Sequence, residues 1–288
     1  MRSPHEIVRK EDLNSEDYLI EVRAPLIARR WKPGQFVVFR LHERGERIPM
    51  SIYDVDVERG TITMFIKKLG KTSLEIYDSF EVGSTIKDVI GPLGNPVEVK
   101  EYGNVVVASD LVCGHAENYA ISKALKGIGN YVISIQGFPT KDKRYVEEEK
   151  RLRSVADEYY IVTEDGSYGI KGLYTDVLER LLGEYDIDMV FAGGTFPGLR
   201  RVAEITKSYN VPAMVTLRTI MVDGTGMCGS CRVEVGGETK FACVDGPMFD
   251  AHKVNFDLVV RRNERFKIEE KKAMERWQRI KGESKWQK

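Results

Sequence analysis

The stretch Asp223 to Cys243, DGTGMCGSCRVEVGGETKFAC, contains three of the four cysteines in the chain. These cysteines are spaced Cys228-x2-Cys231-x11-Cys243, and Asp223 stands before the first of them. Four cysteines of which three are clustered favour cofactor ligation in a reducing compartment over a framework of disulfides. The stretch therefore predicts a metal site, and the rest of the chain is best understood as arranged around it.

The spacing matches a plant-type [2Fe–2S] site, which runs C-x4-C-x2-C followed by a distant cysteine. Asp223 occupies the place of the first thiolate, so the predicted ligands are Asp223, Cys228, Cys231 and Cys243. Structural Zn2+ is one alternative, although zinc sites usually have two C-x2-C pairs or add histidines. Cysteines without a metal are another alternative, and Cys113 or a water could replace Asp223 as the fourth ligand.

The same stretch contains a G-x-G-x-x-G pattern from Gly224 to Gly229. A dinucleotide-binding fingerprint of this form requires a helix after it. Here an alternating strand follows from Cys231 to Val235, and a Gly-Gly turn leads into a second run from Glu238 to Ala242. We therefore predict a β-hairpin, with the glycines serving a loop that wraps a cluster.

Residues 1–99 contain short alternating runs such as YLIEVRAPLI, FVVFRL and TITMFIKKL, separated by turn signals. They predict a small antiparallel β-barrel. Residues 100–215 alternate apolar strands with helical segments, beginning with a strand at 104–108, a helix from Glu117 to Gly127 and a strand at 131–136. This pattern predicts a parallel α/β domain. The overall expectation is a multi-domain α+β chain, with the cluster module at 216–260 and a C-terminal charged helix at 261–288.

Composition limits the function further. Lys and Arg total 44, as do Asp and Glu, so the net charge of the 288 residues is zero. We expect neither nucleic acid nor a membrane as a partner. Because the N-terminal residues are polar throughout, we expect no signal peptide and a cytoplasmic location.

Three pieces of the N-terminal region resemble the flavin-binding barrel of the ferredoxin-NADP reductase superfamily. They are the strand opening PGQFV, the segment RIPMSI at 47–52 and the turn GKTS at 70–73. An arginine fork and the free amides at a helix start both suit a phosphate. The resemblance implies FAD as cofactor, contacted by Arg47, Pro49, Met50, Ser51, Ile52, Ile66, Lys67, Gly70, Lys71, Thr72 and Ser73. The chain departs from the superfamily because Arg47 stands three residues before Met50 rather than two before an aromatic residue.

In the same superfamily the first strand of the α/β domain leads into a glycine-rich turn at which backbone approaches the pyrophosphate of NAD(H). Here that turn is Ser109 to His115, and only Gly114 remains of the glycines. Asp110 and Glu117 add negative charge where a phosphate would lie. The altered turn predicts either weak NAD(H) binding or another terminal electron acceptor.

Cys113 and His115 in this turn present two interpretations. A thiol beside a histidine can be an activated nucleophile. The alternative, which is commoner, is a small buried thiol and a loop histidine. We assign no catalytic residue on this basis.

The order of flavin barrel, nucleotide domain and [2Fe–2S] hairpin resembles the electron-transfer subunits of dihydroorotate dehydrogenase. It is still more similar to the small subunits of NADH-dependent reduced ferredoxin:NADP+ oxidoreductases, which have aspartate at the first cluster position. The resemblance covers roughly residues 15–260. It implies a larger partner subunit with another FAD and [4Fe–4S] clusters, where NADP(H) binds, and electron bifurcation toward ferredoxin.

The predicted function is that of an oxidoreductase subunit that relays electrons between the partner's flavin, its own [2Fe–2S] cluster and its own FAD. A dihydroorotate dehydrogenase-like or sulfide dehydrogenase-like complex is the alternative within this class. A non-catalytic binding module with a structural metal is the alternative from another class. For the tail, Phe266, Met274 and Trp277 form part of an incomplete apolar stripe, which fits either a solvated helix or a partner-docking helix.

Overall fold

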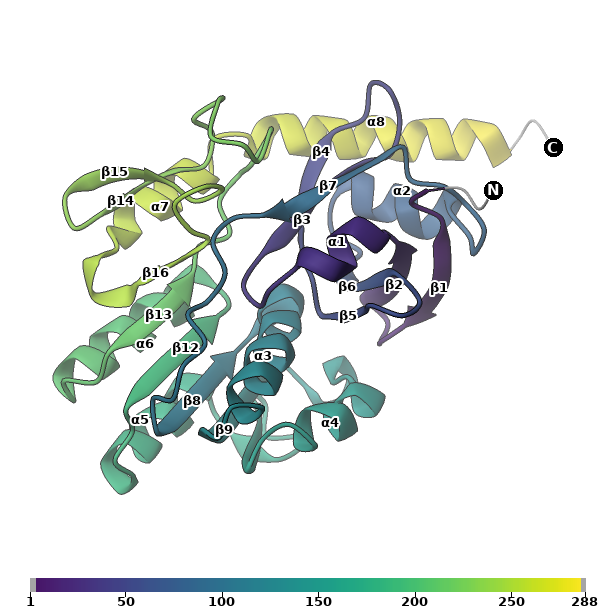
Figure 1. Cartoon of the computed structure of the whole chain (residues 1–288). Coiled ribbons are helices and arrows are strands. Elements are labelled where there is room, and N and C mark those ends of the chain that lie inside the picture. Colours follow the sequence, from purple (N-terminus) through teal and green to yellow (C-terminus); the bar gives the residue numbers. More distant parts are fainter. Residues whose placement is uncertain (1–3, 286–288) are drawn as a thin grey trace.

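The computed structural model describes residues 4–285. Its first region is built from antiparallel strands and two short helices (Figure 1). They are β1 (Ile7–Asp12), β2 (Asp17–Arg23), α1 (Pro25–Arg30), β3 (Phe36–Arg40), β4 (Arg47–Ser51), β5 (Asp54–Asp56), β6 (Thr61–Lys67), α2 (Lys71–Ser79) and β7 (Asp88–Leu93).

Two antiparallel sheets, ordered β1-β2-β6-β5 and β4-β3-β7, enclose one apolar core as the predicted barrel required. Ile20, Phe39 and Met64 are fully buried in it, because alternate side chains of each strand face inward. The predicted β run through residues 18–27 is wrong at its end. Pro25 begins α1 there, since proline suits the first helical position and cannot donate to a sheet.

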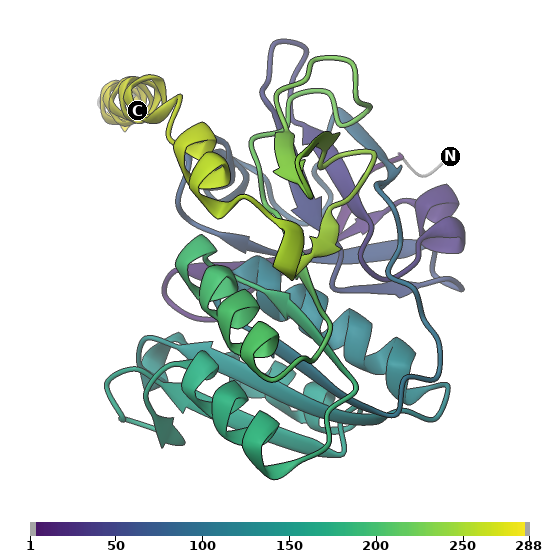
Figure 2. The same ribbon diagram turned by 90° about the vertical axis from the view of Figure 1, so that its left-hand side faces the viewer.

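The second region is a sheet of seven strands in the order β11-β10-β9-β8-β12-β13-β16. All pairs are parallel except that of β13 with β16. Helices α5 and α6 cover one face, and α3 and α4 cover the other (Figures 1 and 2). The bounds are β8 (Asn104–Ser109), α3 (Leu111–Lys126), β9 (Tyr131–Phe138), α4 (Val146–Arg153), β10 (Glu158–Thr163), β11 (Ile170–Lys171), α5 (Tyr174–Glu184), β12 (Met189–Gly193), α6 (Phe196–Ser208), β13 (Ala213–Thr216) and β16 (Met248–Asp250).

Three features of this region differ from the prediction. Helix α3 begins at Leu111 rather than Glu117, so the altered turn is the first turn of a helix. The sequence reasoning did not identify α4 or β13. Strand β16 lies in the predicted cluster module, which starts at residue 216, but it pairs with β13 of the second region through Thr216↔Met248.

The predicted hairpin of the cluster stretch is present as β14 (Arg232–Val235) and β15 (Glu238–Phe241), joined by two glycines with positive φ. The charged tail is not one helix but two, α7 (Phe256–Asn263) and α8 (Lys267–Lys285). Helix α8 runs along the flavin-type barrel and contacts α2 (Figure 1). The Trp277 ring lies 5.8 Å from Lys71 Nζ, so part of the stripe packs within the chain. The side chain of Ile280 and all of Trp286 lie outside what the structure describes.

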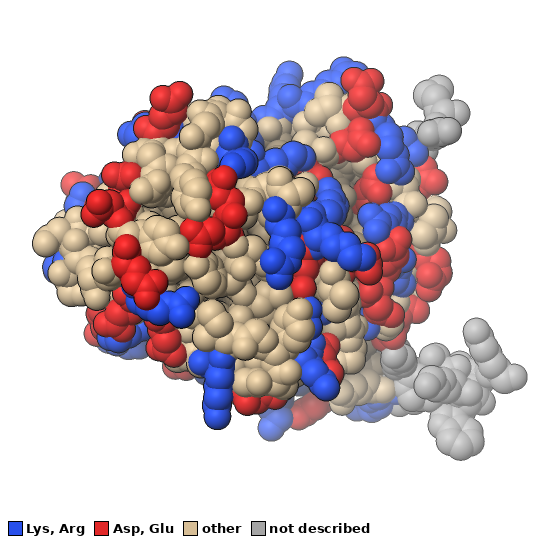
Figure 3. Space-filling model, turned by 90° about the horizontal axis from the view of Figure 1, so that it is seen from below, with Lys and Arg blue, Asp and Glu red and all other residues tan. Residues whose placement is uncertain are grey.

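Charged side chains of both signs are interspersed on the face seen from below in Figure 3, in keeping with a net charge of zero. Within residues 4–285, no helix combines the length and apolar character needed to span a bilayer.

One close backbone approach fixes α3 against the sheet. A Cβ built on Gly114 would lie 2.2 Å from the carbonyl oxygen of Gly193 at the end of β12. The three nearest atoms belong to the backbone of Gly193 and Gly194, so none of them can rotate away as a side chain could. The first turn of α3 can therefore approach β12 only with glycine at position 114.

We expect Gly114→Ala to lower the free energy of unfolding by about 1 to 3 kcal/mol through overpacking. Gly183→Ala is the matched control, since its Cβ would be 3.6 Å from the nearest atom and alanine is the better helix former. Thermal unfolding followed by circular dichroism should show a lower midpoint for the first variant and an equal or higher one for the second. Equal midpoints for both variants would contradict the packing constraint.

Candidate functional site

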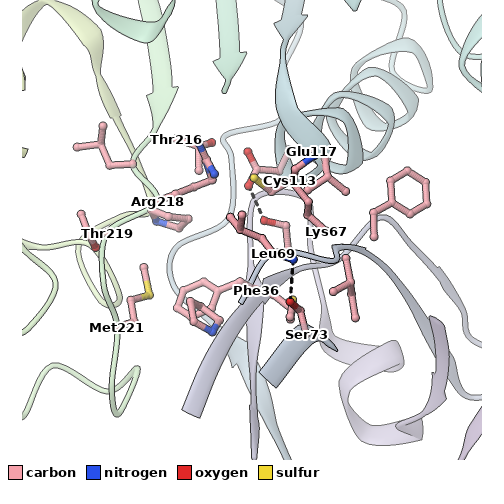
Figure 4. A pocket seen from close by; sticks show the side chains of 18 residues that line it. Phe36, Lys67, Leu69, Ser73, Cys113, Glu117, Thr216, Arg218, Thr219 and Met221 are labelled. Carbon is pink, nitrogen blue, oxygen red and sulfur yellow. Dashed lines mark hydrogen bonds between the residues drawn. The ribbon is translucent and has the colours of Figure 1, made fainter. Parts of the chain in front are cut away.

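A cavity of about 290 Å³ lies where the barrel, the start of α3 and the segment after β13 meet (Figure 4). The barrel contributes one wall and the second region the other. The lining residues are Phe36, Pro49, Met50, Ser51, Phe65, Ile66, Lys67, Leu69, Ser73, Val112, Cys113, Glu117, Thr216, Leu217, Arg218, Thr219, Met221 and Pro247.

Six of the predicted flavin residues line this cavity: Pro49, Met50, Ser51, Ile66, Lys67 and Ser73. The other five do not. Arg47 is exposed and lines a neighbouring groove together with Pro49. The side chain of Ile52, the residue directly after β4, is buried in the barrel core, whereas Ser51 lines the cavity.

The GKTS turn begins α2, as predicted. Ser73 Oγ accepts the Leu69 and Gly70 N–H groups at 3.2 and 3.0 Å. Lys71 pairs with Glu75 at 2.7 Å, and the Thr72 hydroxyl donates to Glu46. Thus Gly70, Lys71 and Thr72 lie at the helix start beside the cavity wall, in a position that suits a phosphate group.

The cavity has unsatisfied polar groups at the end formed by the second region. Glu117, Thr216, Arg218 and Thr219 each have a buried side-chain atom without a hydrogen-bond partner among the described residues. Burial raises the pKa of Glu117, and the Ser51 hydroxyl donates to its other oxygen at 2.7 Å. Because orphaned buried polar atoms are costly, this wall fits a ligand with its own donors and acceptors, as a flavin ring has.

Asp110 joins the starts of two helices. It is the N-cap residue of α3, and its carboxylate accepts the Thr195 N–H at 2.6 Å and the Thr195 hydroxyl at 2.9 Å. Thr195 in turn caps α6. Burial raises the pKa of Asp110. A carboxyl side chain thus occupies the position between helix starts that an anionic pyrophosphate would require.

Next to it, Leu111 adopts φ +60°, in the left-handed region that favours glycine. A leucine therefore stands at a backbone conformation that favours glycine. Beyond this turn, a separate pocket of about 240 Å³ is lined by Asp110 and Glu164 among others. Arg201 also lines it and pairs with Glu179 at 2.8 Å, so the lining carries two acidic groups and one basic group.

Cys113 and His115 do not form a nucleophile pair. His115 Nδ1 lies 3.0 Å from Ser109 Oγ, and its ring stacks on Phe138 with centroids 4.4 Å apart. Burial lowers the pKa of His115 to about 3 and raises the pKa of the Cys113 thiol. The predicted alternative of a buried thiol and a loop histidine is correct only in part, because Cys113 is half-buried and lines the cavity, and His115 is a buried helical residue.

The cluster stretch brings two of its thiols together. Cys231 Sγ and Cys243 Sγ lie 3.2 Å apart, and both residues are buried. Cys228 is exposed in the same loop, and its Sγ accepts the Ser230 N–H at 3.5 Å. Gly224, Gly226 and Gly229 have φ of 76°, 85° and 65°, so the glycines serve the loop and no helix follows them.

Asp223 faces into this loop. Its carboxylate accepts the N–H groups of Thr225, Met227 and Cys228 at 3.1, 3.1 and 2.9 Å. Slight burial raises its pKa, but these bonds outweigh it and the net pKa is lowered, which favours the anion. Within residues 4–285, no group of three or more potential ligands converges closely enough to hold a metal. The donor types and the paired thiols fit an iron–sulfur cluster, while ligation by Asp223 stays a prediction.

Sequence reasoning missed the part of the cavity formed by Thr216 to Thr219, because this stretch begins the predicted cluster module, directly after the predicted α/β domain. The available signal was its place directly after an apolar strand, at the carboxyl edge of a parallel sheet where ligands bind. Sequence reasoning also placed the Glu117 side chain at the helix start where a phosphate of NAD(H) would lie, whereas it lines the flavin-type cavity.

Comparison with known proteins agrees with this architecture. The family model of the iron-sulfur cluster binding domain of dihydroorotate dehydrogenase B matches residues 218–255. A dihydroorotate dehydrogenase B (NAD(+)) electron transfer subunit homolog from Thermotoga maritima is 41% identical over 97% of this chain and 98% of its own length. The dihydroorotate dehydrogenase B (NAD(+)) electron transfer subunit of Bacillus caldolyticus is 33% identical over 82% of this chain and 92% of its own length.

Among solved structures, one of an NADH-dependent reduced ferredoxin-NADP oxidoreductase superposes with a TM-score of 0.89. It is 39% identical and covers 96% of this chain and 98% of that one. These matches support FAD and a [2Fe–2S] cluster as the cofactors and electron transfer as the role, as the sequence predicted. The chain belongs to the family of dihydroorotate dehydrogenase B electron transfer subunits and their homologues.

Proposed function

We propose that this chain relays electrons between a [2Fe–2S] cluster in the loop 223–243 and an FAD in the cavity. The carrying observation is that the cluster loop starts at the cavity wall. Met221 and Phe36 line the cavity, and a Cβ on Gly224 would lie 3.9 Å from the Phe36 ring. Leu93 and Val38 lie nearer still to Gly224, so the start of the cluster loop packs on the barrel strands β3 and β7, of which β3 carries Phe36 into the cavity wall.

When bound, FAD supplies the ability to exchange a pair of electrons as hydride and single electrons with a cluster. The residues that line the cavity would hold the ring. Pro49, Met50 and Ser51 of β4 would contact one side of the ring, and the side chains of Phe36 and Phe65 form an apolar part of the cavity wall. The paired thiols of Cys231 and Cys243, with Cys228 and Asp223, would hold the iron.

The partner in this proposal is a larger subunit that carries its own flavin and [4Fe–4S] clusters, binds NADP(H) and communicates with ferredoxin. Support comes from the similarity along nearly the full length to a ferredoxin-NADP oxidoreductase chain and from Asp223 at the first ligand position. This favours the ferredoxin:NADP+ reaction over a dihydroorotate-linked one for the complex.

The electron acceptor or donor at the small-subunit FAD is, in this proposal, something other than NAD(H). The Asp110 carboxylate already accepts the Thr195 N–H at the start of α6. It also lies so close to the backbone of Gly194 that a Cβ at that position would clash with it. A pyrophosphate would have to displace these bonds and lie beside Asp110 and Glu164, while Arg201 in the same lining is already paired with Glu179. Both steps cost free energy that the ordinary glycine turn does not impose.

The purified chain should carry both a flavin and an iron–sulfur spectrum, with iron and acid-labile sulfide in equal amounts. Ultraviolet-visible spectroscopy and metal analysis would measure this. A colourless protein containing zinc would instead support a non-catalytic module with a structural metal.

Asp223→Cys should retain the cluster and change its electron paramagnetic resonance spectrum and reduction potential, since a thiolate is a softer ligand than a carboxylate. Asp245→Asn, a change at a nearby acid that bonds the Phe241 N–H, is the control. A spectrum and potential equal to those of the parent in the first variant would count against ligation by Asp223.

NADH should fail to bleach the small-subunit flavin in the assembled complex at concentrations that saturate ordinary members of the family. Dithionite serves as the positive control for a reducible flavin. Prompt reduction of this FAD by NADH, followed by stopped-flow absorbance, would be incompatible with the proposed role of Asp110.

A further inference from the structure

The corner between α7 and α8 lies directly on the cluster loop. Arg262 Nη2 lies 3.5 Å from the Gly229 carbonyl oxygen and 3.4 Å from that of Ser230. Arg265 Nη2 donates to the same Ser230 oxygen at 2.8 Å. Gly229 and Ser230 are the two residues between Cys228 and Cys231, so both guanidinium groups contact the span that joins two predicted ligands.

These contacts orient the peptide units of the loop. The C=O and N–H of one peptide point in opposite directions, so a carbonyl bound to arginine turns the N–H of the next residue away from it. The peptide between Gly229 and Ser230 has this arrangement: its oxygen faces Arg262, while its N–H donates to Cys228 Sγ at 3.5 Å. A positive charge at one end of a peptide strengthens the donor at its other end.

The positive charge here is not neutralised by the protein. In the part of the chain that the structure describes, Arg232, Arg262 and Arg265 form no ion pair, and Arg262 Nε is buried without a hydrogen-bond partner. Burial and the neighbouring Arg265 and Arg232 lower the pKa of Arg262, which reflects the cost of gathering these charges. An anionic cluster with thiolate and carboxylate ligands would offset that cost.

We propose that Arg262 and Arg265 are positioning residues that raise the reduction potential of the [2Fe–2S] cluster. Reduction adds one negative charge to the cluster, so nearby cations and N–H···S bonds stabilise the reduced state more than the oxidised one. The family model of the iron–sulfur domain ends at residue 255, so both arginines come from the segment after it. The C-terminal helices thus have a part in tuning electron transfer. This inference rests on the proposed function, because it requires the cluster.

The test is the midpoint potential of the cluster in the full-length holoprotein, measured by a dye-mediated titration followed by electron paramagnetic resonance. Arg262→Gln and Arg265→Gln should each shift the potential to more negative values. We expect the equilibrium constant for reduction to fall by about three- to tenfold, and a tenfold change equals 59 mV for a one-electron couple. Arg261→Gln is the matched control. It removes the same charge from the adjacent position of α7, where the side chain lines a groove with Phe196 and Asp257 and not the cluster loop.

Potentials of both variants equal to that of Arg261→Gln would overturn the inference. Because the potential is measured on loaded clusters, lower cluster content in Arg262→Gln does not obscure the result, and the exposed Arg265 provides an independent variant. A wild-type chain that contains no iron and sulfide would overturn the proposed function as well. A loaded wild-type chain with unmoved variant potentials would overturn this inference alone.

Discussion

The close approach of Gly114 to the Gly193 carbonyl is the constraint on which the candidate site depends. It presses the first turn of α3 against the end of β12. From this position Cys113 and Glu117 reach the cavity, and Asp110 reaches Thr195. One backbone contact therefore positions two features: the wall of the flavin-type cavity that carries Cys113 and Glu117, and Asp110 in the lining of the separate pocket. A side chain at position 114 would disturb both places at once.

The chain retains a nucleotide-binding architecture while changing what that architecture can hold. The parallel sheet and the helices on both faces are intact, and Leu111 keeps the left-handed backbone of a glycine turn. Asp110, however, accepts both the N–H and the hydroxyl of Thr195, the N-cap residue of α6. The physical consequence is that side-chain hydrogen bonds within the chain stabilise the starts of α3 and α6.

Sequence reasoning worked best where the relevant contacts are local. The hairpin after Cys231, the glycine loop around the cysteines and the start of α2 were all predicted, because each depends on neighbouring residues and their preferred φ. It worked less well where distant segments meet. Helix α3 was started too late, since a turn without its glycines looks like a loop, and β16 was not recognised as a strand of the larger sheet.

By itself the sequence determined the cofactor chemistry, because ligand type and spacing in 223–243 and the RIPMSI and GKTS segments are properties of adjacent residues. Only the tertiary structure decided which side chains share a space. It placed Glu117 and Arg218 at one cavity, turned Ile52 into the core while Ser51 faces that cavity, and set Arg262 and Arg265 on the cluster loop. Such contacts join residues far apart in the chain, and they depend on how the sheet, the barrel and the last helices pack, which no local pattern specifies.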